Sequence, residues 1–389
     1  MINFTRLLCD VSQPADALRY GMGHGAPSSA AQRRPIVVWN ITRRCNLKCV
    51  HCYSDSDAHD YPGELTWDQC RAVIDDLAAF GVPGLLLSGG EPLIHPHFFD
   101  IARHAREKGL RVTISTNGTL LTPEIAARIH DIGFAYVGIS LDGIGATHDQ
   151  FRGKPGAFDK AVAAFKYCKA VDQKAGLRLT LTRHTVTDID RILDFIEAEE
   201  IQRVCFYHLV YSGRGINLSL LDPAEIRTAL DKIMDRVEAW HAAGLDREVL
   251  TVDQPADGPY LLQRLAGDPA RRAKALELIQ WNGGGNHSSG VGIGNIDTQG
   301  NVHPDQFWQD HTLGNVKDAP FSEIWSRTDD AILNGLRTRP RPVGGRCATC
   351  RYLDLCGGGF RVRAWQRYGD AWYEDPGCYL SDAEIARGE

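Results

Sequence analysis

Three cysteines lie within eight residues of the chain, in the stretch CNLKCVHC at 45–52. Cys45, Cys49 and Cys52 offer three thiolates from one loop, whereas the commonest metal–thiolate sites take four ligands. A metal centre that keeps one coordination position open is suited to catalysis, because structural sites are closed. Zinc is the alternative, but the nearest further donor, His51, lies inside the triplet, where reaching the same ion would be cramped.

A second group of four cysteines lies near the C-terminus. Two residues separate the first pair, five the next, and 21 precede the last. Four thiolates close a coordination set, so by spacing alone a structural zinc ion and a 4Fe–4S cluster both remain possible. The four residues are Cys347, Cys350, Cys356 and Cys378.

Composition excludes several classes of function. The chain has 389 residues, a formal net charge of -6 and 43% hydrophobic residues. No basic patch dominates, so we expect no nucleic-acid partner. No apolar run is long enough to span a membrane, and the N-terminus does not resemble a signal peptide. We therefore expect a cytoplasmic protein whose cysteines do not form a disulfide framework.

Apolar runs alternate with amphipathic stretches from residue 36 onward. This alternation indicates a parallel sheet covered by helices. Six such units are too few for an eight-fold barrel and predict an α/β fold with a partial (β/α)6 barrel. The expected strands are 36–41, 84–88, 111–116, 135–141, 176–182 and 203–211, and the expected helices are 66–80 (with Thr66 as N-cap), 97–108, 123–132, 157–171 and 188–200.

Unusual residues follow the end of every expected strand. In a parallel barrel these ends meet at one rim, where active sites form. Six motifs over one rim are stronger evidence for an active site than any single motif. They are the three-cysteine loop, GGEP at 89–92, Thr116–Asn117, Ser140 with Asp142 and Gly143, Thr182–Arg183, and Tyr211 with Gly213.

The organisation of the chain follows from these patterns. We expect a flexible N-terminal arm at 1–35, the partial barrel at 36–221 and a helical bridge at 222–285. The Gly-rich stretch 283–295 is either a lid or a plain linker. A small C-terminal domain at 286–389 would then hold the four-cysteine group.

The three-cysteine spacing after a first strand resembles that of the radical SAM superfamily. The resemblance implies that Cys45, Cys49 and Cys52 hold a 4Fe–4S cluster whose open iron binds S-adenosyl-L-methionine, and that reduction yields a 5′-deoxyadenosyl radical. It also implies which residues contact S-adenosyl-L-methionine. The methionine amino group would contact Gly89, Gly90, Glu91 and Pro92. The methionine carboxylate would contact Ser140 and Arg152, and the ribose would contact Thr116 and Asn117.

The C-terminal cysteine group resembles the SPASM/twitch region of radical SAM enzymes, including the lead-in LGNVKDAPFSEIW. The full SPASM form binds two auxiliary clusters. Here Asp305 and Phe360 stand where cysteines are usual. The resemblance therefore implies one auxiliary 4Fe–4S cluster with four cysteine ligands, and space for a large substrate between the domains.

The segments VVWNITRRCNLKCVHCYSDSD, LLLSGGEPL, GISLDGIGATHDQFRG and GNVHPDQFW closely resemble the NirJ family, the radical SAM proteins of haem d1 biosynthesis. The resemblance runs from about residue 36 to the end. It implies a didecarboxysiroheme-like iron tetrapyrrole as substrate, removal of propionate side chains from two pyrrole rings, and an electron donor such as flavodoxin or ferredoxin.

Three alternatives stay open. Related haem-pathway enzymes share the layout and remove other side chains. SPASM-type enzymes modify peptides, although the sequence contains no separate peptide-docking domain at its N-terminus. A non-enzymatic protein would use both cysteine groups structurally, and its iron and sulfide content would distinguish it.

A substrate with several carboxylates should contact cationic or histidine side chains. Candidates at the rim or the domain junction are Arg183, His208, Arg214, His287 and His303. His303 is also a candidate ligand of the substrate iron. An ordinary hydrogen-bonding role is the alternative for each of these residues.

Overall fold

The apolar runs of the chain form one large sheet. The computed structural model describes residues 1–13, 16, 34–327 and 329–386. Within them it holds an 11-stranded sheet of order β1-β8-β7-β6-β5-β4-β3-β2-β9-β10-β11. The strands are β1 (Ile2–Asn3), β2 (Ile36–Thr42), β3 (Leu85–Gly89), β4 (Val112–Thr116), β5 (Tyr136–Ser140), β6 (Ala175–Leu181), β7 (Arg203–His208), β8 (Glu248–Val252), β9 (Ile293–Ile296), β10 (Asn301–His303) and β11 (Gly314–Asn315).

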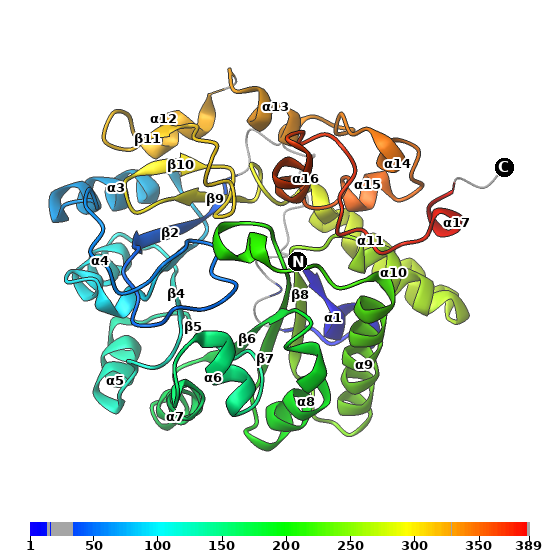
Figure 1. Ribbon diagram of the computed structural model, residues 1–389, viewed down its shortest axis with the longest axis horizontal. Helices are drawn as coiled ribbons and strands as arrows, with labels where there is room; N and C mark the ends of the chain where they lie inside the picture. The colour runs from blue at the N-terminus through cyan, green and yellow to red at the C-terminus, as the bar shows by residue number, and fades with distance from the viewer. Residues whose placement is uncertain (14–15, 17–33, 328, 387–389) are drawn as a thin grey trace.

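All six expected strands are confirmed, and strands β2 to β8 run parallel to one another. The five expected helices are confirmed as well, and Figure 1 shows them around the outside of the sheet. Thr66 is the N-cap of the first of them, as predicted, and it forms a capping box with Gln69. These helices are α3 (Trp67–Phe80), α4 (Phe98–Glu107), α5 (Pro123–Ile132), α7 (Ala157–Ala170) and α8 (Ile189–Ala198), with a short additional α6 (Ala146–Arg152).

Alternation along the central strands separates a helix-covered face from an open one. In β6, Leu177, Leu179 and Leu181 are buried in the core that the helices share. The residues between them include Arg178 and Thr180, which are only half-buried. Because neighbouring residues of a strand point to opposite faces, these two lie on the concave side of the sheet. The concave side is therefore accessible and can receive ligands.

The predicted flexible arm is wrong for its first residues. Ile2 and Asn3 pair with β8 in antiparallel register, and α1 (Phe4–Cys9) follows. Phe4, Leu7 and Leu8 are buried, because this short apolar segment covers the outermost parallel strand. Residues 14–15 and 17–33 of the predicted arm lie outside the described part of the chain.

The predicted helical bridge contains three helices, as expected, and one strand that was not predicted. The helices are α9 (Pro223–Ala242), α10 (Asp257–Arg264) and α11 (Pro269–Asn282). The strand is β8, which extends the parallel sheet beside β7. Its five residues, EVLTV, are all buried. The run lies between α9 and α10, in a stretch whose other apolar positions follow a helical period, which explains why it was missed.

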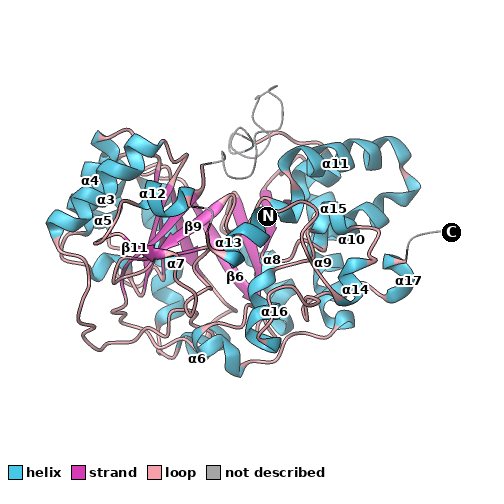
Figure 2. Ribbon diagram, turned by 90° about the horizontal axis from the view of Figure 1, so that it is seen from above, coloured by secondary structure: helices cyan, strands magenta, loops and turns pink. Residues whose placement is uncertain are grey.

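The C-terminal region continues the same sheet, because β9 runs parallel to β2 on the opposite side from β3. Figure 2 shows the sheet in the middle, with α3 to α5 beyond one side and α9 to α11 beyond the other. No helix among the described residues is both long and apolar enough to cross a membrane. The remaining helices are α12 (Phe321–Ser326), α13 (Ala331–Arg337), α14 (Gly345–Ala348), α15 (Leu353–Cys356), α16 (Arg361–Tyr368) and α17 (Asp382–Ile385).

Candidate active site

The three-cysteine loop leaves the carboxyl end of β2 and folds back on itself. The backbone N–H of Cys45 donates to the carbonyl of Asp57 at 2.7 Å, which closes the base of the loop. Cys45 and Cys49 are buried and Cys52 is half-buried. The three thiols pack together around Leu47. The loop thus brings its three thiols close together.

Each of the three sulfur atoms faces an N–H donor. The distances range from 3.4 to 3.9 Å. Such donors stabilise a thiolate that is bound to a metal. Burial raises the pKa of Cys45 to about 12, so a bound cation is needed to keep that sulfur ionised. The donors are the backbone N–H groups of Leu47 and Ser56 and the side chains of Asn117 and Arg152.

This donor set fits an iron–sulfur cluster. Three thiols from one loop leave a fourth position open, which suits a cluster that also binds a ligand. Among the described residues no group of three His, Cys, Asp or Glu side chains is arranged to hold a metal ion. The observation that favours a cluster here is that the three thiols come from one loop and pack together.

Arg152 lies between the cysteine loop and the end of β5. One terminal nitrogen donates to Cys49 Sγ at 3.6 Å, and the other forms an ion pair with Asp142. Although burial opposes its charge, Arg152 holds the pKa of Asp142 below the usual range. If Arg152 binds a methionine carboxylate as predicted, its guanidinium must therefore contact Asp142 and Cys49 at the same time.

The two glycines of GGEP allow the chain to cross the cysteine loop. A Cβ on Gly90 would lie 2.6 Å from the carbonyl oxygen of Arg43 and closer still to that of Arg44. The N–H of Gly90 donates to the Thr42 carbonyl at 2.7 Å. From the resemblance, Gly90 was expected to contact the methionine amino group of the cofactor. In the structure the neighbour is the backbone that enters the cysteine loop.

Glu91 is buried and links the end of β3 to the end of β4 through hydrogen bonds. Its carboxylate accepts hydrogen bonds from the Thr116 hydroxyl and the Asn117 backbone N–H, both at 2.8 Å. Burial raises the pKa of Glu91 to about 7. The Asn117 side chain donates to Asn46 in the cysteine loop at 2.9 Å. Glu91, Thr116 and Asn117, all predicted to contact the cofactor, are thus hydrogen-bonded to one another. The half-buried Ser140 hydroxyl has no hydrogen-bond partner among the described residues.

Arg214 braces the cysteine loop, which the sequence analysis did not foresee. Its guanidinium donates to the carbonyls of Cys49 and Ser56, each at 2.8 Å, and to the Asp55 carboxylate at 2.7 Å. The neighbouring Gly213 lies against the same loop. All three nitrogens are engaged, so the predicted role of Arg214 at a substrate carboxylate is wrong for this arrangement. An Arg one residue after a rim glycine is the available sequence signal.

The other predicted substrate contacts are also mostly engaged. Arg183 is exposed and pairs with Glu225 at 3.2 Å. Both ring nitrogens of His303 have protein partners, at 2.8 and 3.4 Å, so this residue does not offer a ligand to a substrate iron. His208 lies 3.0 Å from the Asp257 carboxylate, and the ring of His287 packs against Gly292.

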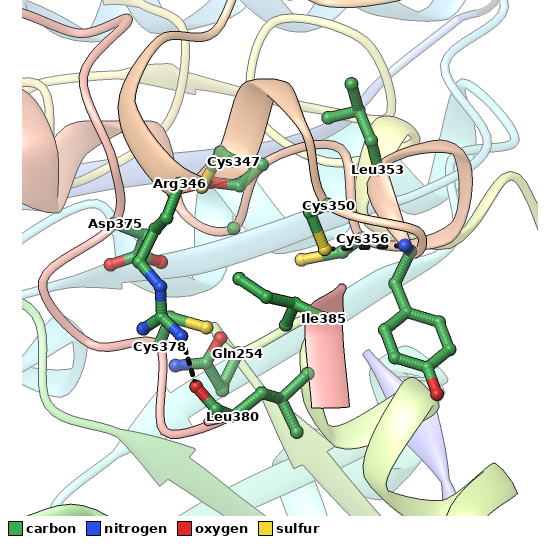
Figure 3. Close-up of a pocket in the computed structure, with 13 residues that line it drawn as sticks. Gln254, Arg346, Cys347, Cys350, Leu353, Cys356, Asp375, Cys378, Leu380 and Ile385 are labelled. Carbon is green, nitrogen blue, oxygen red and sulfur yellow. Dashed lines mark hydrogen bonds between the residues drawn. The ribbon is translucent and has the colours of Figure 1, made fainter. Parts of the chain in front are cut away.

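The four C-terminal cysteines line one hollow of about 410 Å³, part of which opens to solvent. Figure 3 shows their side chains directed toward this common space. Burial raises the pKa of Cys378 to about 11 and that of Cys356 well above its ordinary value. The backbone N–H of Tyr352 donates to Cys350 Sγ at 3.3 Å. Four thiols around a volume are a donor set that fits a cluster.

Two buried cations lie near this hollow. Arg361 Nη1 donates to backbone carbonyl groups, whereas its Nε and Nη2 are buried without any partner among the described residues. Arg341 donates only to carbonyl groups, and no described carboxylate pairs with it or with Arg361. Buried guanidinium groups require compensating negative charge. A group of metal-bound thiolates would supply that charge.

The two departures from the full SPASM pattern have structural roles. Asp305 is buried, accepts a hydrogen bond from the Ser289 hydroxyl, and accepts another from the N–H of Phe307 at 2.8 Å. Phe360 packs edge-to-face on Phe307. Neither residue lines the four-cysteine hollow.

Comparisons with known proteins agree with this geometry. Residues 39–196 match the model of the radical SAM superfamily. The chain is 47% identical to the Fe-coproporphyrin III synthase of Methanosarcina barkeri, over 99% of each chain. It is 46% identical to the pre-heme d1 synthase of Dinoroseobacter shibae, over 90% of this chain and 87% of that protein. Streptococcus suis SuiB bound to S-adenosylmethionine has the same fold, with a TM-score of 0.70 at 18% identity, over 90% of this chain and 78% of SuiB.

The parallel barrel, the three-thiol loop and these likenesses define a radical SAM enzyme. Enzymes of this superfamily use a 4Fe–4S cluster and S-adenosyl-L-methionine. Within the superfamily, the chain belongs to the family of haem-biosynthesis enzymes that includes the two relatives above.

Proposed function

We propose that this enzyme removes propionate side chains from a didecarboxysiroheme-like iron tetrapyrrole, as in haem d1 biosynthesis. The observation that carries the proposal is the 46% identity to a pre-heme d1 synthase along 90% of the chain. The three-thiol loop above an accessible concave face supports it, because a large substrate needs room beside the cluster. The carbon atoms to be attacked are unactivated, so acid–base catalysis alone cannot break their bonds.

In this proposal the cluster is held by Cys45, Cys49 and Cys52. When bound, the reduced cluster and S-adenosyl-L-methionine supply a 5′-deoxyadenosyl radical. The Ser140 hydroxyl is free to bind the methionine carboxylate, with Arg152 beside it. The remaining residues that were predicted to contact the cofactor act by positioning the cysteine loop. Gly89 to Pro92, Thr116 and Asn117 join β3 and β4 to the cysteine loop and so orient it.

The four C-terminal cysteines would hold one auxiliary 4Fe–4S cluster. The hollow that they line and the two buried arginines beside it support this assignment. The auxiliary cluster could accept an electron from the substrate or only stabilise the C-terminal fold. An electron donor such as flavodoxin or ferredoxin would reduce the first cluster.

Formation of Fe-coproporphyrin III is a second candidate function. It is favoured by the 47% identity to an Fe-coproporphyrin III synthase over 99% of both chains. The two candidates share the radical chemistry and differ in the side chains that are removed. They therefore predict different macrocycle masses from one substrate.

An anaerobic reaction analysed by mass spectrometry tests the proposal. It contains reconstituted enzyme, S-adenosyl-L-methionine, a reductant and didecarboxysiroheme. Formation of 5′-deoxyadenosine together with loss of propionate supports haem d1 chemistry, and Fe-coproporphyrin III as product supports the second candidate. Nucleoside with an unchanged macrocycle would overturn both. A Cys45→Ala variant, which lacks one ligand of the first cluster, controls for nucleoside that arises without the cluster.

A further inference from the structure

One cation on the concave face, Arg178, has no ion-pair or hydrogen-bond partner among the described residues. Arg178 lies on β6, a central strand with β5 on one side and β7 on the other. Among the described residues it forms no ion pair or hydrogen bond, and its Nε is buried without a partner. In sequence it is a single arginine within the apolar run GLRLTLT. The arginines that the sequence analysis selected, Arg183 and Arg214, are engaged elsewhere.

The neighbouring strands make room for this side chain. A Cβ on Gly138 of β5 would lie 2.6 Å from Arg178 Nε, so only glycine leaves space there. The guanidinium lies 5.5 Å from the ring centroid of Tyr207 on β7. Arg178 is the register partner of Ser140, but its side chain extends over Gly138, one pleat deeper into the barrel. Its position therefore differs from that expected for the methionine carboxylate.

No described carboxylate forms an ion pair with Arg178. Asp253 follows β8 and exerts an electrostatic effect on Arg178, yet the two residues do not form an ion pair. Burial, together with the nearby Asp305 carboxylate, raises the pKa of Asp253 to about 7. Its Oδ2 has no hydrogen-bond partner among the described residues. A guanidinium that is enclosed and unpaired is costly, and a bidentate carboxylate is the ligand that fits it best.

We propose that Arg178 binds a side-chain carboxylate of the substrate inside the barrel. This inference rests on the proposed function, in which the substrate is a tetrapyrrole with several carboxylates. Such side chains are flexible arms that can reach a cation below the rim while the macrocycle stays outside. Arg178 then positions the ring relative to the cluster and is not itself a catalytic residue.

Binding measurements on cluster-containing enzyme test this role without relying on turnover. Absorbance titration gives the affinity for didecarboxysiroheme, and equilibrium dialysis gives the affinity for S-adenosyl-L-methionine. We expect Arg178→Gln to weaken tetrapyrrole binding at least about 30-fold, as when one partner of a buried charged pair is removed. Binding of S-adenosyl-L-methionine should not change. Arg178→Lys should restore part of the affinity, because it keeps the charge but loses the planar fork.

Arg183→Gln is the matched control, since Arg183 is the next basic residue along the chain but is exposed and paired with Glu225. It should leave both affinities unchanged. Retained tetrapyrrole binding in Arg178→Gln would overturn the role of Arg178. A parallel loss of S-adenosyl-L-methionine binding would also overturn it, by assigning the carboxylate to the cofactor. Wild-type enzyme that binds no didecarboxysiroheme would instead refute the proposed function, and with it this ligand.

Discussion

Arg214 offers a test of how the tertiary structure supports the cysteine loop. Its guanidinium joins the segment after β7 to the loop through two carbonyl groups and one carboxylate. We predict that Arg214→Met, which keeps an apolar stem and removes the donors, will increase opening of residues 45–57. The rest of the barrel should stay folded, because Arg214 makes these contacts only with the loop.

The expected magnitude follows from the three contacts. A hydrogen bond from a charged donor contributes about 1.5–3 kcal/mol. The pair with Asp55, which is half-exposed, adds less than about 1 kcal/mol. Because contacts to one loop are not additive, we take the lower limit for the two carbonyl bonds, about 3 kcal/mol. At 1.4 kcal/mol per tenfold change, the open population should rise about 150-fold.

Hydrogen–deuterium exchange of the loop and chelator-driven iron release measure this opening. The amide of Cys45, which donates to Asp57 in the closed loop, is a direct reporter. Arg183→Met is the control, because Arg183 leaves the rim toward Glu225 and does not contact the loop. Exposed pairs of this kind change stability by at most about 1 kcal/mol.

Equal exchange and equal iron release in the two variants would refute the reasoning. That result would mean that Arg214 does not brace the loop and is available for a substrate carboxylate, as its sequence position first suggested. Faster exchange throughout the barrel would also contradict it, because the effect would then be global.

Three further predictions concern other parts of the molecule. Gly90→Ala should lower the yield of folded protein, since its Cβ would overlap backbone of the cysteine loop, whereas Gly267→Ala, with nothing within 4 Å, should not. Cys378→Ser should lower the iron and sulfide content of the protein by about half if two clusters are present. Cys205→Ser is the control and should leave the iron and sulfide content unchanged. A full iron content in Cys378→Ser would exclude the auxiliary cluster. Asp257→Asn should lower the free energy of unfolding by about 3 kcal/mol. The reason is that the buried carboxylate of Asp257 accepts a hydrogen bond from the Tyr379 hydroxyl at 2.7 Å and contacts His208. A thermal unfolding midpoint equal to that of the wild type would contradict this prediction.

Much of the fold was predictable because its signals are local. Continuous apolar strands and amphipathic helices identified six parallel strands and five helices, and the Thr66 capping box marked one helix start. The misses were β8, which lies between two helices of the predicted bridge, and the two-residue opening strand β1. These segments become strands only because the edge of an existing sheet pairs with them.

The candidate site was predictable in position but not in detail. The cysteines could be grouped from spacing, since residues a few positions apart stay close in space whatever the fold. The contacts of Arg152 with Cys49, of Glu91 with Thr116 and of Arg214 with Cys49 could not, because the partners lie 103, 25 and 165 residues apart in sequence. Which arginine keeps a free guanidinium depends on those partners. Arg178 was overlooked for this reason.

The sequence by itself determined which thiols can share a centre, which strands run parallel, and that their ends form one rim, because spacing and periodicity are properties of neighbouring residues. The tertiary structure alone decided which polar groups at that rim hold the protein together and which remain free for ligands. That division depends on distances between strands, since a hydrogen bond or ion pair forms only between atoms that folding brings within about 3–4 Å.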